Sequence, residues 1–125
     1  MKRLLPLLLL SLKLFTPPVS QSQEEALGLR LIAVRTEAEA VGMRDQILSG
    51  ASFEALAKSH SVHATASTGG YLGLLHLTDL KPELQRALTG LAPGRISAVT
   101  PLDGGFALFQ RLSVEEVDWI VSNEA

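Results

Sequence analysis

The sequence predicts an α+β domain in which a small antiparallel four-stranded sheet packs against three to four helices. Three observations support this class. Apolar runs of strand length alternate with segments of helical periodicity, turns built on glycine and proline separate the last strands, and no internal repeat or linker divides the chain. The 125 residues, 46% of them hydrophobic, suit one compact core and are too apolar for a disordered tail.

The first residues have the layout of a secretory signal peptide. Two basic residues precede the leucine-rich run 4–12, and small residues follow near Ser20. A membrane anchor is the alternative, but a spanning helix needs about 20 apolar residues, and Pro6 and Lys13 interrupt this run well before that length. We therefore expect cleavage of residues 1–22, export to the periplasm or the extracellular space, and no stable membrane insertion afterwards.

Cysteine content and charge exclude several classes of protein. The chain has no cysteine, which rules out the lipid-modified cysteine of a bacterial lipoprotein and any disulfide or thiolate chemistry. Without Lys2, Arg3 and Lys13 of the leader, eight basic residues face 13 acidic ones, a formal charge of −5. Such an unclustered acidic balance argues against a nucleic-acid partner.

The first elements after the leader have clear boundaries. Residues 29–34 form a compact apolar run that predicts a buried strand. Thr36 and Glu39 have the spacing of a capping box, and Gly50 supplies the left-handed residue that closes many helices. A helix is therefore expected over residues 37–49.

A second helix, a loop and a strand follow. Ser52 is placed to cap a helix whose inner face ends at His60, after which residues 61–68 lose all periodicity and predict a loop. Residues 69–75 are apolar and glycine-rich together, which indicates a short strand approached closely by another chain or a ligand. A turn-like stretch over residues 76–81 leads onward.

The remaining elements are a third helix and a hairpin. Pro82 suits a first helical position, and apolar residues continue at helical spacing to Leu91. The strands expected at residues 96–99 and 106–112 are joined by a turn at Asp103-Gly104-Gly105. In the extension 114–125, the capping-box spacing that begins at Ser113 favours a helix, although a strand is nearly as consistent with the pattern.

The order of these landmarks resembles a parvulin, the PpiC-type peptidyl-prolyl cis-trans isomerase or rotamase domain, over residues 27–113. No single motif is decisive, but five follow one another in the family's order and spacing. They are Ala-Ser-Phe-Glu-Ala-Leu-Ala-Lys at 51–58 with Ser61, Gly-Gly-Tyr-Leu-Gly at 69–73, Leu-Lys-Pro-Glu-Leu at 80–84, Leu-Ala-Pro-Gly-Arg-Ile-Ser at 91–97 and Gly-Gly-Phe-Ala-Leu at 104–108.

The resemblance implies rotation about Xaa-Pro bonds of secreted or envelope proteins, without a cofactor. The partners it implies are unfolded or extended proline-containing polypeptides. The family lines its proline pocket with apolar side chains, and the matching positions in this sequence all remain apolar, although each of these leucines taken singly suits ordinary core packing as well. The matching positions are Leu72, Leu75, Leu80 and Leu84.

The polar part of the family's site is replaced in this sequence. The two histidine positions of the family match Leu31 and Ala107, and the aspartate or cysteine after the second helix matches His63. His63 is the one polar side chain left at a matched catalytic position. The alternative interpretation is a histidine that is exposed on a loop and has no catalytic role. His60 lies three residues away, but no third ligand is near, so no metal site is predicted.

Three hypotheses therefore stay open. The first is an exported isomerase of low activity that helps proteins to fold. The second is a non-catalytic chaperone or adaptor of the same fold. The third is an interaction domain whose pocket is closed by Leu31 and Ala107.

Overall fold

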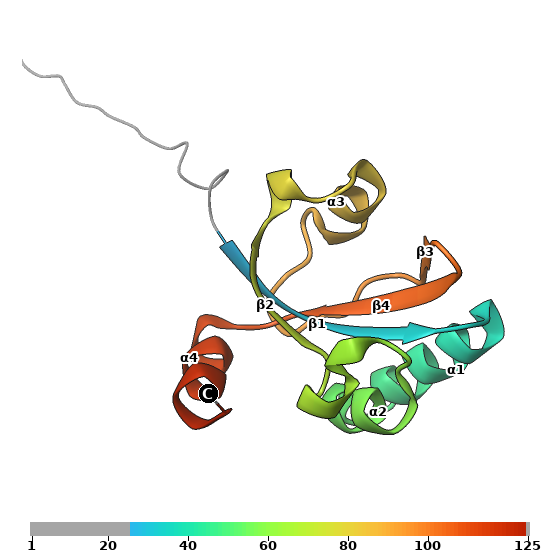
Figure 1. Cartoon of the computed structure of the whole chain (residues 1–125), viewed down its shortest axis with the longest axis horizontal. Coiled ribbons are helices and arrows are strands. Elements are labelled where there is room, and N and C mark those ends of the chain that lie inside the picture. The colour runs from blue at the N-terminus through green and yellow to red at the C-terminus, as the bar shows by residue number, and fades with distance from the viewer. Residues whose placement is uncertain (1–25, 125) are drawn as a thin grey trace, which may run out of the picture.

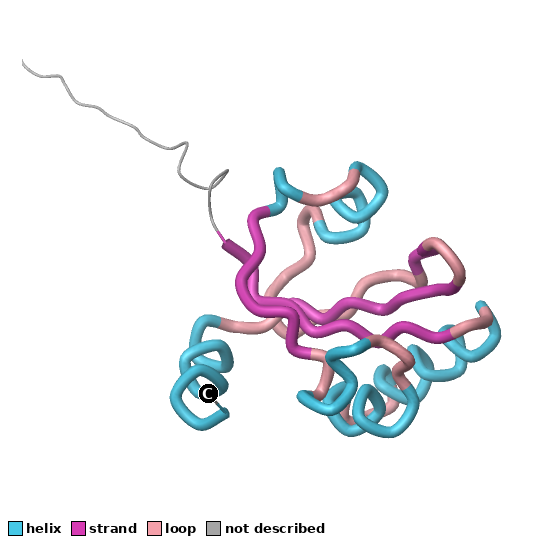
Figure 2. The backbone as a smooth tube through the Cα atoms, viewed as in Figure 1, coloured by secondary structure: helices cyan, strands magenta, loops and turns pink. Residues whose placement is uncertain are grey.

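The computed structural model describes residues 26–124 (Figures 1 and 2). The predicted signal peptide lies outside these residues, and none of the described helices is long and apolar enough to cross a bilayer. The elements are β1 (Ala26–Val34), α1 (Glu37–Leu48), α2 (Phe53–His60), the 3₁₀ helix η3 (Ala64–Thr68), β2 (Tyr71–His76), the 3₁₀ helix η4 (Leu77–Asp79), α3 (Pro82–Leu88), β3 (Thr100–Leu102), β4 (Gly105–Arg111) and α4 (Val114–Glu124).

The predicted α+β class is confirmed, because the sheet has four antiparallel strands in the order β2-β1-β4-β3. The central strand β1 is buried on both faces, and alternate residues serve different layers. Leu29 and Leu31 pack in the layer of α3, whereas Ile32 and Val34 pack in the layer of α1 and α2. Figure 1 shows α3 on one side of the sheet and α1, α2 and α4 on the other.

Side-chain caps fix the starts of α1 and α2 as predicted. The hydroxyl of Thr36 accepts from the amide of Glu39 at 3.1 Å, and the Glu39 carboxylate accepts from the Thr36 amide at 3.2 Å. At α2, the hydroxyl of Ser52 accepts from the amide of Ala55 at 3.1 Å. These caps satisfy amides that have no partner inside the helix.

The segment predicted as a loop over residues 61–68 is only partly irregular. It contains η3, and its first residues cover the edge of β1 beyond Tyr71, where β2 begins. The amide of Ala33 donates to the hydroxyl of Ser61 at 3.0 Å, and the Val62 amide donates to the carbonyl of Ala33 at 2.8 Å. This segment therefore replaces a strand partner, and so it has a fixed place in the fold.

The prediction of a strand at residues 96–99 is wrong. The regular ladder with β4 begins only at Thr100. A single bridge joins Ile96 to Gln110, and the hydroxyl of the buried Ser97 accepts from the amide of Phe109 at 3.0 Å. The carbonyl of Ser97 accepts instead from Arg44 Nε at 3.0 Å. These side-chain bonds displace the ladder, so one extra residue separates the bridge from β3.

The tail beyond Arg111 is a helix, as the capping-box spacing favoured. The Ser113 hydroxyl accepts from the amide of Glu116 at 3.1 Å. Val117 and Ile120 are buried together with Leu112, and Tyr71 packs against them. Helix α4 is thus docked on the sheet.

Shorter boundary differences follow from local bonds. Strand β1 includes Ala26, which pairs with His76. Helix α3 ends at Leu88, because the chain then turns and the amide of Leu91 donates to the carbonyl of Leu88 at 3.0 Å. The turn-like stretch expected at residues 76–81 contains η4.

Candidate functional site

The structure gathers the six predicted pocket residues in one apolar cluster between the sheet and α3. Leu31 comes from β1 and Ala107 from β4, and both belong to the buried base of the cluster. The other four are partly buried and pack against that base from β2, from the residue that follows η4 and from α3. They are Leu72, Leu75, Leu80 and Leu84.

A cavity of about 630 Å³ opens at one side of this cluster, between α3 and β3. This volume lies within the usual range for ligand sites. Leu80 and Leu84 line it, together with Pro101 and Leu102 from β3. The charged side chains of this cavity, Asp79, Lys81, Glu83, Arg86 and Asp103, include both signs.

The sequence pattern did not indicate Pro101 and Leu102, because they lie between the strand expected at residues 96–99 and the turn at Asp103 and belong to neither. Their signal is the apolar pair itself, placed directly before a hairpin turn. Across the same mouth, Lys81 Nζ lies 3.9 Å from a carboxylate oxygen of Asp103. Both side chains are exposed, so this ion pair contributes little to stability.

The two positions that match the family's histidines form part of the packed core. Leu31 is 4% exposed and Ala107 is fully buried. Ala107 pairs with Ala33 on β1 and with Thr100 on β3. Thr100 is a buried polar neighbour on the same sheet, but its hydroxyl donates to the Ala98 carbonyl at 3.0 Å. The layer beneath the site therefore holds alkyl groups at both positions, and neither residue lines the cavity.

His63 lies outside the apolar cluster. Its ring caps η3, because Nδ1 accepts from the amide of Thr65 at 3.2 Å and lies 3.0 Å from the Thr65 hydroxyl. The side chain is exposed, and the adjoining Val62 is held against Ala33, the partner of Ala107. Only Nε2 is left to meet a ligand. In residues 26–124, no three His, Asp or Glu side chains are grouped to hold a metal ion.

A buried arginine anchors the far end of the His63 segment. Arg30 is 6% exposed, its Nη1 donates to the Gly69 carbonyl at 3.0 Å, and its Nη2 lies 3.8 Å from the carboxylate of Glu54. The amide of Leu31 donates to the carbonyl of Gly70 at 2.8 Å. The segment is thus tied to β1 at both ends. Its signal in the sequence is an arginine inside an apolar strand.

The fold and the site define a small domain with a cavity, lined by apolar and charged side chains, on one face of an antiparallel sheet. The model of the Rotamase family, described as the PPIC-type PPIASE domain, matches residues 18–113. The chain therefore belongs to the PpiC-type peptidyl-prolyl isomerase domain family, the parvulins. Helix α4 lies beyond the matched residues.

Curated relatives include proteins named Chaperone SurA from several organisms. The one from Aromatoleum aromaticum is 39% identical over 74 residues, which are 59% of this chain and 17% of the relative. The one from Nitrosospira multiformis is 32% identical over 99 residues, which are 76% of this chain and 22% of the relative. The chain thus spans about a fifth of the length of these relatives.

Solved structures support the same family. The parvulin domain of PpiD from E. coli is 29% identical with a TM-score of 0.64, over 73% of this chain and 89% of that domain. The peptidylprolyl isomerase PrsA from Bacillus anthracis is 28% identical with a TM-score of 0.67, over 81% of this chain and 50% of that protein. These neighbours share the α+β fold described above.

Proposed function

We propose that this domain binds Xaa-Pro segments in the cavity between α3 and β3 and accelerates their cis-trans isomerisation weakly, as part of an exported folding factor. The single observation that carries the proposal is the open cavity lined by Leu80, Leu84, Pro101 and Leu102 beside a fully apolar base. A cavity of this size, with these four apolar side chains in its wall, suits a pyrrolidine ring and its neighbours.

The apolar residues of the cavity would contribute to catalysis by removing the Xaa-Pro amide from water. The barrier to isomerisation is about 20 kcal/mol, and it arises from the double-bond character of the amide. Water stabilises the planar, charge-separated amide, so an apolar site favours the twisted state relative to the planar one. A positioned polar group typically adds about 100 to 10,000-fold. The apolar Leu31 and Ala107 supply no such group, so slow turnover is expected.

The second candidate function is binding without turnover. It is favoured by the His63 ring, whose Nδ1 already caps η3, and by the buried alkyl groups at Leu31 and Ala107. A domain of this kind holds extended segments and leaves their isomer ratio to spontaneous exchange, which takes tens to hundreds of seconds.

The partners and the location of the protein belong to the same proposal. Unfolded, proline-containing segments of secreted or envelope proteins are the expected clients, in keeping with the similarity to proteins named Chaperone SurA. The signal-like leader supports export to the periplasm or beyond.

Exchange NMR on a short Ala-Leu-Pro-Phe peptide tests the proposal. Cross-peaks between cis and trans signals that require the protein establish catalysis, whereas shifted peptide signals without exchange establish binding alone. Leu84→Asp places a charge in the cavity and is expected to abolish both effects. Leu48→Asp is the matched control, because Leu48 is 60% exposed on α1 across the sheet. Binding that survives in the Leu84→Asp protein rules out the cavity as the site.

A further inference from the structure

The two edges of the sheet differ in how they are protected. The edge strand β3 has three residues, and Pro101 at its centre lacks an N–H donor. The edge strand β2 has six residues, Tyr71–His76, with no proline, lysine or acidic residue. Natural proteins usually protect sheet edges with such residues, because an open edge pairs with other chains. Strand β2 is therefore the open edge.

The outer backbone of β2 is free to pair in the described structure. Strand β2 bonds to β1 in a ladder that joins Ala26–Leu29 to residues 73–76, with a bulge beyond it. Within residues 26–124, no main-chain group from another element bonds to these four residues on the outer side. Every second residue of an antiparallel edge points its N–H and C=O outward. A Cβ placed on Gly73 would meet no atom within 4 Å, so space beside the bulge is open.

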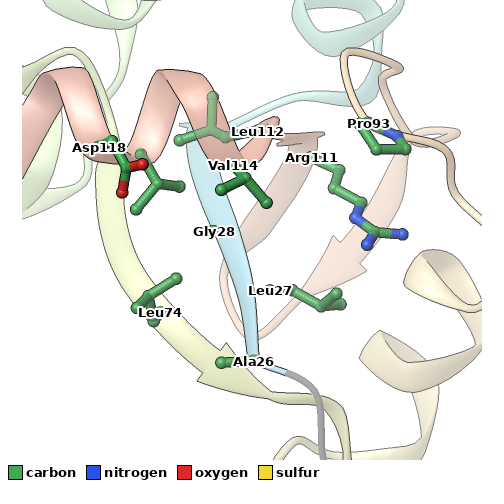
Figure 3. Close-up of a pocket in the computed structure, with 10 residues that line it drawn as sticks. Ala26, Leu27, Gly28, Leu74, Pro93, Arg111, Leu112, Val114 and Asp118 are labelled. Atoms are coloured by element: carbon green, nitrogen blue, oxygen red, sulfur yellow. The ribbon is translucent and has the colours of Figure 1, made fainter. Parts of the chain in front are cut away.

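A hollow lies beside β2 on the α4 face of the sheet, over the start of β1. It measures about 200 Å³, and Figure 3 shows Leu74 of β2 on one side of it, Pro93 and Arg111 on the other, and Val114 and Asp118 of α4. Leu74 is 55% exposed and Val114 is 73% exposed. Helix α4 buries Val117 and Ile120 but leaves Val114 uncovered. The hollow is thus the uncovered half of the α4 contact.

We propose that the edge of β2 binds an extended, proline-free segment of a client polypeptide by strand addition. The segment pairs its backbone with residues 73–76 and packs an apolar side chain against the exposed side chain of Leu74. Main-chain hydrogen bonds supply affinity, and alternate side chains supply specificity. This binding goes beyond the proposed prolyl function, because proline has no N–H to donate to the edge.

The position of β2 in the chain indicates a client polypeptide as the occupant. Strand β2 ends at His76 and continues directly into η4, whose last residue Asp79 lines the proline cavity with Leu80. A polypeptide held at the cavity therefore has the open edge within reach. Leu72 and Leu75 of the same strand already pack in the apolar cluster of the cavity.

The test uses the acetylated peptide Lys-Val-Thr-Val-Thr-Val-Lys and the same peptide N-methylated at alternate residues. We expect the first peptide to shift the amide signals of residues 72–76 and to slow their hydrogen exchange. N-methylation removes about three donors and is expected to weaken binding at least about tenfold. Leu74→Lys is expected to weaken binding about fivefold or more, because it removes an apolar contact.

Leu84→Asp is the matched control, because it blocks the proline cavity and should leave this binding unchanged. The two proposals therefore fail in different experiments. The prolyl function fails if the proline peptide still binds to the Leu84→Asp protein, and strand addition fails in the binding experiments with the proline-free peptide. Equal binding of the N-methylated peptide, or shifts confined to α3 and β3, overturns strand addition. Strand addition by a client is also overturned if the amides of residues 72–76 become more protected from hydrogen exchange as the protein concentration increases without peptide. That result would assign the edge to a second copy of the chain.

Discussion

Gly70 is a residue whose backbone conformation no other side chain fits. Its φ is +84°, and a Cβ at this position would collide with the carbonyl oxygen of Leu31. Gly42, in contrast, lies inside α1, and a Cβ there would meet no atom within 4 Å. The two glycines therefore predict opposite effects of the same substitution.

Gly70→Ala is expected to destabilise the protein by roughly 2 kcal/mol or more, because it adds strain and separates the His63 segment from β1. Gly42→Ala is expected to stabilise it by about 0.5 to 1 kcal/mol through helix propensity. Urea unfolding monitored by circular dichroism measures both. Equal midpoints for the two variants would contradict the assignment of Gly70 as a point of close approach.

Ala107 limits the size and polarity of the side chain that the base of the site can hold. Because it is fully buried between two strands and α3, a histidine there adds volume and a polar ring to a packed layer. Ala107→His is expected to lower the free energy of unfolding by roughly 2 to 5 kcal/mol instead of restoring a catalytic group. Ala92→His, at an exposed position, is the control. An Ala107→His protein of unchanged stability and higher turnover would show that the layer can open.

At the scale of elements, the packing of α4 on the sheet requires a residue without a side chain in β1. Gly28 faces Val117, and a Cβ on Gly28 would overlap the Val117 Cγ2. The contact lets the helix lie directly on the strand, with Leu112 and Ile120 buried beside it. A helix of 11 residues is marginal on its own, so its stability comes from this packing.

Gly28→Ala is therefore expected to release α4 while the rest of the sheet stays folded. Hydrogen exchange of the α4 amides should rise at least about tenfold, and the helices α1 and α2 should keep their protection. Val117→Ala removes the overlapping methyl group, so the double variant is expected to regain part of the lost protection. If the two substitutions add without coupling, the close approach of Gly28 and Val117 does not hold α4.

The sequence predicted elements well where a local signal decides them. The capping boxes at Thr36 and Ser113 marked the starts of α1 and α4, because their side chains bond within one turn. The strand expected at residues 96–99 was misplaced because Ser97 bonds to Phe109 and Arg44 through groups that pattern alone does not connect. Long-range side-chain bonds therefore set the boundaries that periodicity misses.

At the scale of the whole molecule, the sequence predicted which residues gather but not where the cavity opens. The resemblance to parvulins pointed to six apolar residues, and the structure places all six in one cluster. The cavity itself depends on how α3 and β3 are held apart, so only Leu80 and Leu84 of the six line it. The role of His63 at the site stays a prediction, and the structure adds that its ring caps η3.

The proposed proline cavity and the proposed β2 edge together predict how a longer client binds. Antiparallel pairing, the more stable arrangement, places the amino end of an added segment near His76, from which the chain continues to the cavity at Asp79 and Leu80. A peptide with Leu-Pro before a proline-free strand, joined by a Gly-Ser linker, is therefore expected to bind about 100-fold or more tighter than either half.

The peptide with the two halves in reverse order is the matched control for this prediction. It offers the same side chains, but its proline is expected at the Gly73 end of β2, away from the cavity. Isothermal titration of both peptides, repeated with Leu84→Asp and with Leu74→Lys, separates the two contributions, because each variant should reduce the linked peptide to the affinity of one half. Equal affinities for the two orders would mean that the two sites do not act on one chain, whereas tighter binding of the reversed peptide would mean that the added strand is parallel.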